Sequence, residues 1–178
     1  MIVTVRGAND RDLTKLLKMA AESFAKKLLS PQLIRNISVK VVIKPQDKMD
    51  AGGYCDIAED DDCVYPRNFV IEIARTRKKI HMFTVLAHEM VHLKQMATGE
   101  MKDRYIKHKY VTVWQGDRYE DDILYWDQPW EIEAYGLENG LVAKFLIEHN
   151  QFKNLRQKEQ DWFVYDELET YASEERKV

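Results

Sequence analysis

The sequence contains few cysteines, no long apolar run and little net charge. Only 2 of its 178 residues are cysteine, Cys55 and Cys63, and their separation lacks the C-x-x-C spacing of a zinc knuckle. We therefore expect two reduced thiols, although spacing alone leaves a disulfide between them open. No internal repeat and no low-complexity linker divides the chain. With 45% hydrophobic residues, a chain of this length is expected to form one compact domain.

The absence of a long apolar segment also bears on location and partners. No stretch reaches the roughly 18 apolar residues that span a bilayer, and the first residues lack the basic and apolar regions of a signal peptide. We therefore expect a cytoplasmic protein with no membrane partner. The formal net charge is −3 and the pI is near 6.0, so the composition argues against a nucleic-acid partner unless a basic surface is local.

Local patterns predict both strands and helices, and hence an α+β fold. Alternating apolar residues or β-branched runs indicate strands, and apolar residues at helical spacing indicate helices. The aromatic, acidic segment up to Asp127 follows neither pattern. The predicted strands are 2–5, 37–43, 54–57, 69–74 and 110–114, and the predicted helices are one to Leu28 capped by Asn9 or Asp10, then 80–97 and 130–149.

The helix expected at 80–97 contains the motif HEMVH at residues 88–92. Apolar residues cover nearly every face of this helix, so we expect it to be buried. His88 and His92 are four residues apart and project from one face, where both imidazoles can bind a single zinc ion. Glu89 lies beside them and can take a proton from a water molecule whose pKa the metal lowers. Because buried imidazoles and carboxylates cost free energy without partners, this setting favours a metal site.

A catalytic zinc site needs a third protein ligand and one open position. The remaining histidines are poor candidates for this ligand. His108 lies in the polar stretch KDRYIKHKY, where a surface position is expected. His81 lies at the start of the motif helix, and His149 closes the later helix at an expected exposed position.

A better candidate comes from the sequence PWEIEAYG, residues 129–136, at the start of a second helix. Pro129 suits the first turn of a helix. Glu131 and Glu133 point about 200° apart on that helix, so only one of them can face inward. The apolar side of the helix lies closer to Glu131, which we therefore favour as the third ligand, while Glu133 stays open as an alternative.

Other side chains could support such a site. Glu138 lies two turns after Glu131 on the same stripe, where a carboxylate could orient a metal-bound histidine, although a plain surface position fits it equally well. A phenol from Tyr119, Tyr125 or Tyr135 could stabilise the oxyanion of a tetrahedral intermediate. The sequence does not distinguish among these three tyrosines.

HEMVH followed about forty residues later by a helical Glu resembles the gluzincin branch of zinc peptidases. In that branch the ligand Glu is commonly followed by a small residue three positions on and a polar one at four. Ala134 fits this pattern and Tyr135 departs from it, which leaves the usual carboxylate partner of the first histidine unassigned. Over about residues 69–141 the chain is similar to small metallopeptidases of tailed phages and bacteria, related in pattern to minigluzincin and SprT-like domains.

This resemblance implies a zincin-like fold and a zinc-dependent hydrolase. The expected fold is a small mixed or antiparallel sheet packed on the motif helix and on a second ligand-bearing helix. It would be a single domain over residues 1–178, with 151–178 as a C-terminal helix or tail. The implied site holds Zn²⁺ on His88, His92 and Glu131, with Glu89 as general base and a protein or peptide as substrate.

The resemblance also implies a place for the substrate and for the protein. The strand before the motif helix would line the cleft and could pair with an extended peptide. The expected location becomes the cytoplasm of a bacterium or of a phage-infected host cell. The oligomeric state does not follow from these patterns.

Two other functions are compatible with the motif. A SprT-like protease would act on proteins attached to DNA, but the sequence shows no basic or zinc-ribbon module for binding DNA. A zinc-stabilised structural or binding module, such as a phage assembly component, would keep the site for folding. Such a module has no need of Glu89 as a base, so the motif favours the peptidase.

Overall fold

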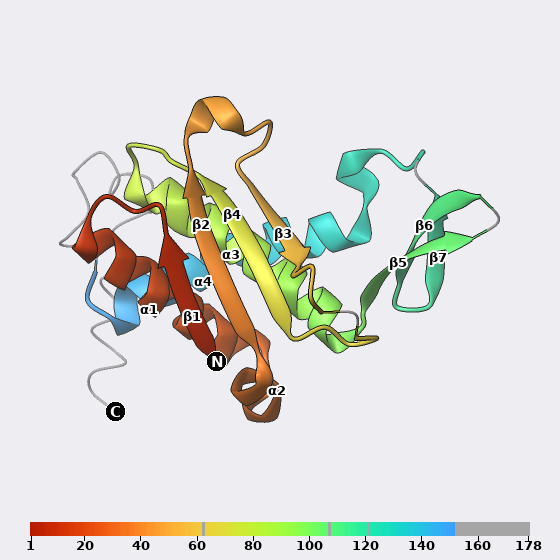
Figure 1. Cartoon of the computed structure of the whole chain (residues 1–178), viewed down its shortest axis with the longest axis horizontal. Coiled ribbons are helices and arrows are strands. Elements are labelled where there is room, and N and C mark those ends of the chain that lie inside the picture. The colour runs from red at the N-terminus through yellow and green to blue at the C-terminus, as the bar shows by residue number, and fades with distance from the viewer. Residues whose placement is uncertain (62, 107, 121, 152–178) are drawn as a thin grey trace.

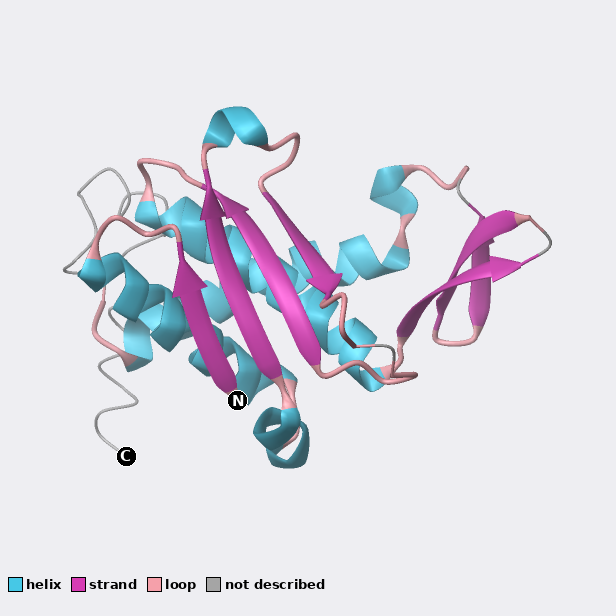
Figure 2. Cartoon of the chain, in the orientation of Figure 1, coloured by secondary structure: helices cyan, strands magenta, loops and turns pink. Residues whose placement is uncertain are grey.

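The computed structural model describes residues 1–61, 63–106, 108–120 and 122–151, which form an α+β fold (Figure 1, Figure 2). The helix or tail predicted for 151–178 lies, apart from residue 151, outside the described residues. None of the described helices is both long and apolar enough to cross a membrane. In chain order the elements are β1 (Ile2–Arg6), α1 (Arg11–Leu28), α2 (Pro31–Asn36), β2 (Ser38–Lys44), η1 (Gln46–Lys48), β3 (Gly53–Ile57), β4 (Asn68–Ala74), α3 (Lys79–Thr98), β5 (Met101–Ile106), β6 (Lys109–Trp114), β7 (Asp117–Glu120), η2 (Tyr125–Asp127) and α4 (Pro129–Glu148).

The larger sheet has four strands in the order β1-β2-β4-β3. β1, β2 and β4 are parallel, and β3 runs antiparallel to β4 at the edge. One face of this sheet is apolar, because alternate residues such as Val41 and Ile71 are fully buried, whereas Lys40 is exposed on the other face. The helices α1, α3 and α4 lie together behind the sheet in the view of Figure 1. The expected α+β class is therefore confirmed, and the sheet is of the mixed kind.

The three long helices pack on one another through aromatic side chains. Phe145 of α4 meets Phe24 of α1 and Phe83 of α3 edge to face, with ring centroids 5.9 Å and 5.4 Å apart. α3 is apolar on nearly every side because it lies between the sheet and the other two helices. It ends where expected, at Gly99, whose φ of 79° is the left-handed conformation that glycine adopts most readily.

A second, three-stranded antiparallel sheet, β5-β6-β7, follows α3 and lies at one end of the molecule (Figure 2). The strand predicted at 110–114 is confirmed as β6, but β5, β7 and the short helix α2 were not predicted. β5 and β7 are largely exposed, so their sequences lack the apolar alternation that marks a half-buried strand. His108 lies exposed between β5 and β6, as expected of a surface histidine.

The acidic segment between β3 and β4 is held by one carboxylate. Asp61 accepts backbone hydrogen bonds from Arg67 at 2.6 Å, Asn68 at 2.7 Å and Cys63 at 3.2 Å. These bonds, that from Arg67 above all, lower the pKa of Asp61 from 3.8 to about 2. Cys55 and Cys63 form no disulfide with each other, in agreement with the prediction of reduced thiols.

Replacing Asp61 with asparagine is expected to lower the free energy of unfolding by about 1 kcal/mol at pH 7, since charge-assisted bonds are lost from a solvent-screened site. The folded-state pKa lies below the unfolded one, so this stabilisation is present above about pH 4 and is lost as the pH falls toward 2. Urea unfolding from pH 7 to pH 3 should show the gap between wild type and variant closing. Asp60→Asn serves as the control, and a gap that stays constant with pH would contradict the argument.

Candidate metal centre

Three side chains from two helices converge where α4 packs against α3. His88 and His92 project from one face of α3, and their Nε2 atoms are 3.1 Å apart. Glu131, in the first turn of α4, has one carboxylate oxygen 3.2 Å from Nε2 of His88 and the other 3.3 Å from Nε2 of His92. All three side chains are buried. Among the described residues they form a group whose donor atoms could hold a metal ion.

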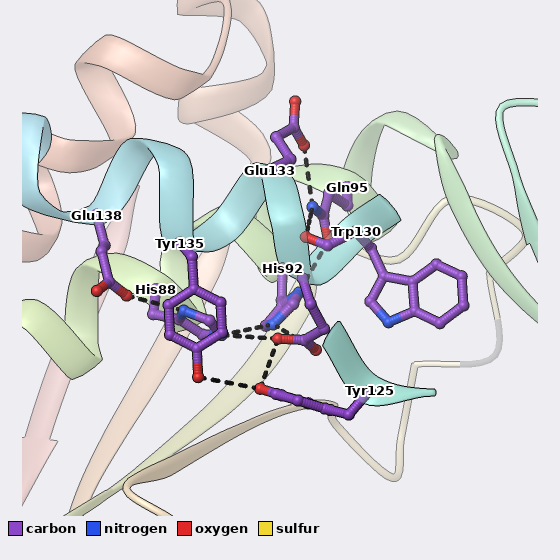
Figure 3. A network of polar contacts seen from close by, with 9 residues as sticks. His88, His92, Gln95, Tyr125, Trp130, Glu133, Tyr135 and Glu138 are labelled. Carbon is purple, nitrogen blue, oxygen red and sulfur yellow. Dashed lines mark hydrogen bonds and ion pairs between the residues drawn. The ribbon is translucent and has the colours of Figure 1, made fainter. Parts of the chain in front are cut away.

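The hydrogen bonds on the far side of each imidazole fix its protonation (Figure 3). Nδ1 of His88 is 2.9 Å from Glu138 Oε2, which as a carboxylate can only accept. Nδ1 of His92 is 2.8 Å from Oε1 of Gln95, an amide oxygen that also accepts. Both Nδ1 atoms must therefore carry a proton, so that in the neutral imidazoles both Nε2 atoms present lone pairs toward Glu131.

The orientation of the Gln95 amide is itself fixed by its neighbours on α4. Its Nε2 group donates to the backbone carbonyl of Trp130 and to a carboxylate oxygen of Glu133, both at 2.9 Å. Two acceptors on that side require the nitrogen there, which leaves the amide oxygen for His92. Gln95 is fully buried and so connects His92 to the helix that carries Glu131.

The donor atoms suit a zinc ion in both spacing and charge. Ligand atoms about 2.05 Å from a tetrahedral zinc ion lie about 3.3 Å from one another, close to the distances found between His88, His92 and Glu131. Two nitrogen lone pairs and a carboxylate facing one point repel one another unless a cation or a proton lies between them. Imidazole and carboxylate are also common zinc ligands.

The pKa values reflect the same demand for positive charge. Burial lowers the pKa of His88, but its hydrogen bonds to the carboxylates of Glu131 and Glu138 outweigh burial and raise the pKa to about 9. Burial also lowers the pKa of His92, but its hydrogen bonds with Glu131 and Gln95 outweigh burial and raise the pKa. Burial alone would raise the pKa of Glu131, yet the two histidines hold it well below its usual value. Without a metal, these shifts favour protonated imidazoles beside an ionised Glu131.

Glu89 lies next to this group but takes a different position. It is 6% exposed, and burial raises its pKa to about 7, although His92 and His88 act in the opposite direction. The edge strand β3 leaves room for it through Gly53, since a Cβ there would lie 2.7 Å from Oε1 of Glu89 and 2.6 Å from Cγ1 of Val85. Glu89 is thus a carboxyl group that can gain or lose a proton near neutral pH.

A cleft of about 450 Å³ opens over these groups. Its walls come from the edge strand β3, from α3, from β5 and β6 of the small sheet, and from the segment that leads into α4. The residues that line it are Ala51, Gly53, Tyr54, Cys55, His88, Glu89, His92, Met101, Asp103, Thr112, Tyr125, Gln128, Trp130 and Glu131. A ligand in the cleft would reach the candidate metal donors and Glu89 together.

Two of the three candidate tyrosines lie at this site. The hydroxyl of Tyr125 donates to Oε2 of Glu131 at 2.7 Å and lies 3.3 Å from that of Tyr135. Burial raises the pKa of Tyr125, and Tyr135 and Glu131 raise it further, so this phenol remains a hydrogen-bond donor. The ring of Tyr135 packs edge-on against His88, with centroids 4.6 Å apart. Tyr119 instead packs against Trp130.

The structure brings together the residues singled out by the motif and separates the two alternative carboxylates. Glu131 faces His88 and His92, whereas Glu133 lies 2.9 Å from Lys94 and binds Gln95. The sequence left Glu138 either beside a histidine or at a plain surface position. In the structure its carboxylate contacts His88.

The other histidines lie elsewhere. His81 is exposed. His149, expected to be exposed, is instead half-buried with its ring 5.2 Å from that of Phe145, because it caps α4 against the core. Gln95 was missed by sequence reasoning, although its position three residues after His92 on a helix is a usable signal.

Comparison with protein-family models, curated proteins and solved structures gave no match to this chain. The resemblance to gluzincins therefore rests on the two sequence motifs, and the function has to be argued from the chemistry of the site.

Proposed function

We propose that this protein is a zinc-dependent metallopeptidase of the gluzincin type, with His88, His92 and Glu131 as ligands. One observation carries the proposal: two imidazole lone pairs and a carboxylate converge beside a buried glutamate at an open cleft. A site kept only for folding would need the three donors but neither Glu89 nor the cleft. A zincin-like fold, which the resemblance to gluzincins implies, is part of this proposal.

In the proposed mechanism the zinc ion, Glu89 and Tyr125 have separate roles. A bound zinc ion supplies Lewis acidity, which polarises a peptide carbonyl and lowers the pKa of water. Glu89 takes the proton from the attacking water and passes it to the leaving amine, and its place at the cleft beside the three donors suits both tasks. The phenol of Tyr125 lies in the cleft, and we assign it to the developing oxyanion, to which it can donate once its single O–H turns away from Glu131.

Glu138 takes the supporting role that the gluzincin pattern left unassigned. It holds the Nδ1 proton of His88 at 2.9 Å and so turns Nε2 toward the other donors. Because it lies seven residues after Glu131, both carboxylates project from the same side of α4. The second helix thus provides one proposed ligand and the carboxylate that orients another.

The full chain is expected to bind one equivalent of zinc and to lose peptide hydrolysis when the metal is removed. Elemental analysis of the purified protein measures the metal, and hydrolysis of a mixed peptide library is followed before and after treatment with a chelator. Zinc, but not magnesium, should restore hydrolysis, because imidazole ligands favour zinc.

Circular dichroism of the metal-free chain separates the proposal from its alternative. A chain that stays folded without metal and regains hydrolysis with zinc supports the peptidase. If metal removal unfolds the chain and the zinc-bound form hydrolyses no peptide, the site is structural.

A further inference from the structure

The two faces of the small sheet differ in charge. Strand register assigns the faces, because directly paired residues and every second residue along a strand share a face. Asp103 pairs with Thr112, and Tyr105 pairs with Tyr110. One face therefore carries Met101, Asp103, Tyr105, Tyr110, Thr112, Trp114, Asp117 and Tyr119, and the other carries Lys102, Arg104, Ile106, Lys109, Val111, Val113, Arg118 and Glu120.

The first of these faces, which we call the acidic face, adjoins the candidate metal centre. Met101, Asp103 and Thr112 line the same cleft as His88 and Glu89. Farther along the face, Trp114 and Tyr119 pack against Trp130 of α4, with ring centroids 6.4 Å and 5.7 Å apart. The acidic face thus forms one wall of the cleft and continues outward from it.

The charges of this sheet are segregated. At the strand positions of β5, β6 and β7 all lysines and arginines fall on the opposite face, where Lys109 is paired with Glu120 at 2.6 Å. The acidic face carries two aspartates and no lysine or arginine. A ligand lying along the cleft wall therefore meets negative charge without a competing cation from the same face.

Asp103, in the cleft, is followed along the acidic face by two exposed tyrosines outside the cleft. The hydroxyl of Thr112 donates to Oδ1 of Asp103 at 2.8 Å and so orients its carboxylate. Next along the face, Tyr105 and Tyr110 are 63% and 67% exposed, with ring centroids 5.1 Å apart. Exposed tyrosine rings attract a guanidinium or ammonium group, and a carboxylate beside them can pair with the same group.

We propose that Asp103, Tyr105 and Tyr110 form a subsite for an arginine or lysine side chain of the peptide substrate. The apolar stem of that side chain would lie on the tyrosine rings while its cationic end pairs with Asp103. This inference rests on the proposed peptidase function in naming a peptide as the ligand, and it goes further by naming the side chain that the cleft selects.

The test compares a labelled peptide that contains a single arginine with the same peptide containing citrulline, which keeps the shape but lacks the charge. Binding to the full chain carrying Glu89→Gln is measured by fluorescence anisotropy, so that no turnover is needed. The arginine peptide should bind about five- to tenfold more tightly, and the preference should weaken at high salt. Asp103→Asn should reduce the preference to within about twofold, whereas the matched control Asp47→Asn, in the exposed turn η1, should leave it unchanged.

The outcomes separate this inference from the proposed function. Equal binding of the two peptides, or a preference that survives Asp103→Asn, would overturn the subsite even if the wild-type chain hydrolyses both. A preference that depends on Asp103, together with a zinc-loaded wild-type chain that hydrolyses no peptide, would support the subsite and refute the peptidase.

Discussion

Replacing Glu89 with glutamine is expected to lower kcat for peptide hydrolysis by about a thousandfold or more, while the protein still binds one zinc ion. The amide has nearly the shape of the carboxyl group, so the narrow space beside Gly53 and Val85 stays filled. It cannot accept the proton of the attacking water, so the step that this carboxylate performs is lost. Glu89 lies outside the group of His88, His92 and Glu131, and metal affinity should therefore change little.

Two measurements on the same preparation test this expectation: zinc content by elemental analysis and single-turnover hydrolysis of a peptide that the wild type cleaves. Glu72→Gln is the matched control, since it makes the same chemical change on β4, where the carboxylate pairs with Lys44. Hydrolysis that persists in Glu89→Gln would remove this residue from the mechanism. Loss of zinc together with hydrolysis would instead make Glu89 part of the metal site.

Replacing Glu131 with glutamine is expected to weaken zinc binding by more than about a hundredfold and to abolish hydrolysis with it. The carboxylate lies against both imidazoles, so the substitution removes a proposed ligand and the negative charge that balances the cation. The metal-free site changes as well, because Glu131 is the main group that raises the pKa of both histidines. Their pKa values should fall in the variant, which proton NMR titration of the imidazoles can follow.

Glu133→Gln is the matched control for Glu131→Gln, two residues away on the same helix. Its carboxylate contacts Lys94 and Gln95, so only an indirect effect on His92 is expected, with zinc affinity within a few-fold of wild type. Competition with a fluorescent chelator measures both affinities. The opposite ranking would make Glu133 the third ligand and would contradict the arrangement proposed here.

Much of the fold and of the candidate site follows from local patterns. The motif helix could be predicted because it is apolar, uninterrupted and closed by Gly99, which are properties of consecutive residues. Glu131 could be distinguished from Glu133 because helical geometry turns them apart, and the apolar side of α4 faces α3. The strands of the larger sheet show their buried face as alternation in the sequence.

The remaining features depend on contacts between segments far apart in the chain. The role of Gln95 appears only once the start of α4 lies beside α3, since both acceptors of its amide belong to that helix. Tyr125 could not be chosen from the nine tyrosines because its contact with Glu131 depends on the turn at η2. β5 and β7 could not be predicted because exposed strands carry polar residues on both faces.

The small sheet is inserted in the chain between the helix that carries HEMVH and the helix that carries Glu131. Its packing on α4 runs through Trp114 and Tyr119 against Trp130, the residue before the proposed ligand Glu131. If both proposals hold, selectivity is encoded in β5 to β7 and bond cleavage in α3 and α4, which are separate stretches of the chain. An engineer could exchange β5 to β7 for a sheet of different surface, keep those two aromatic contacts, and redirect the proposed hydrolytic centre to another peptide.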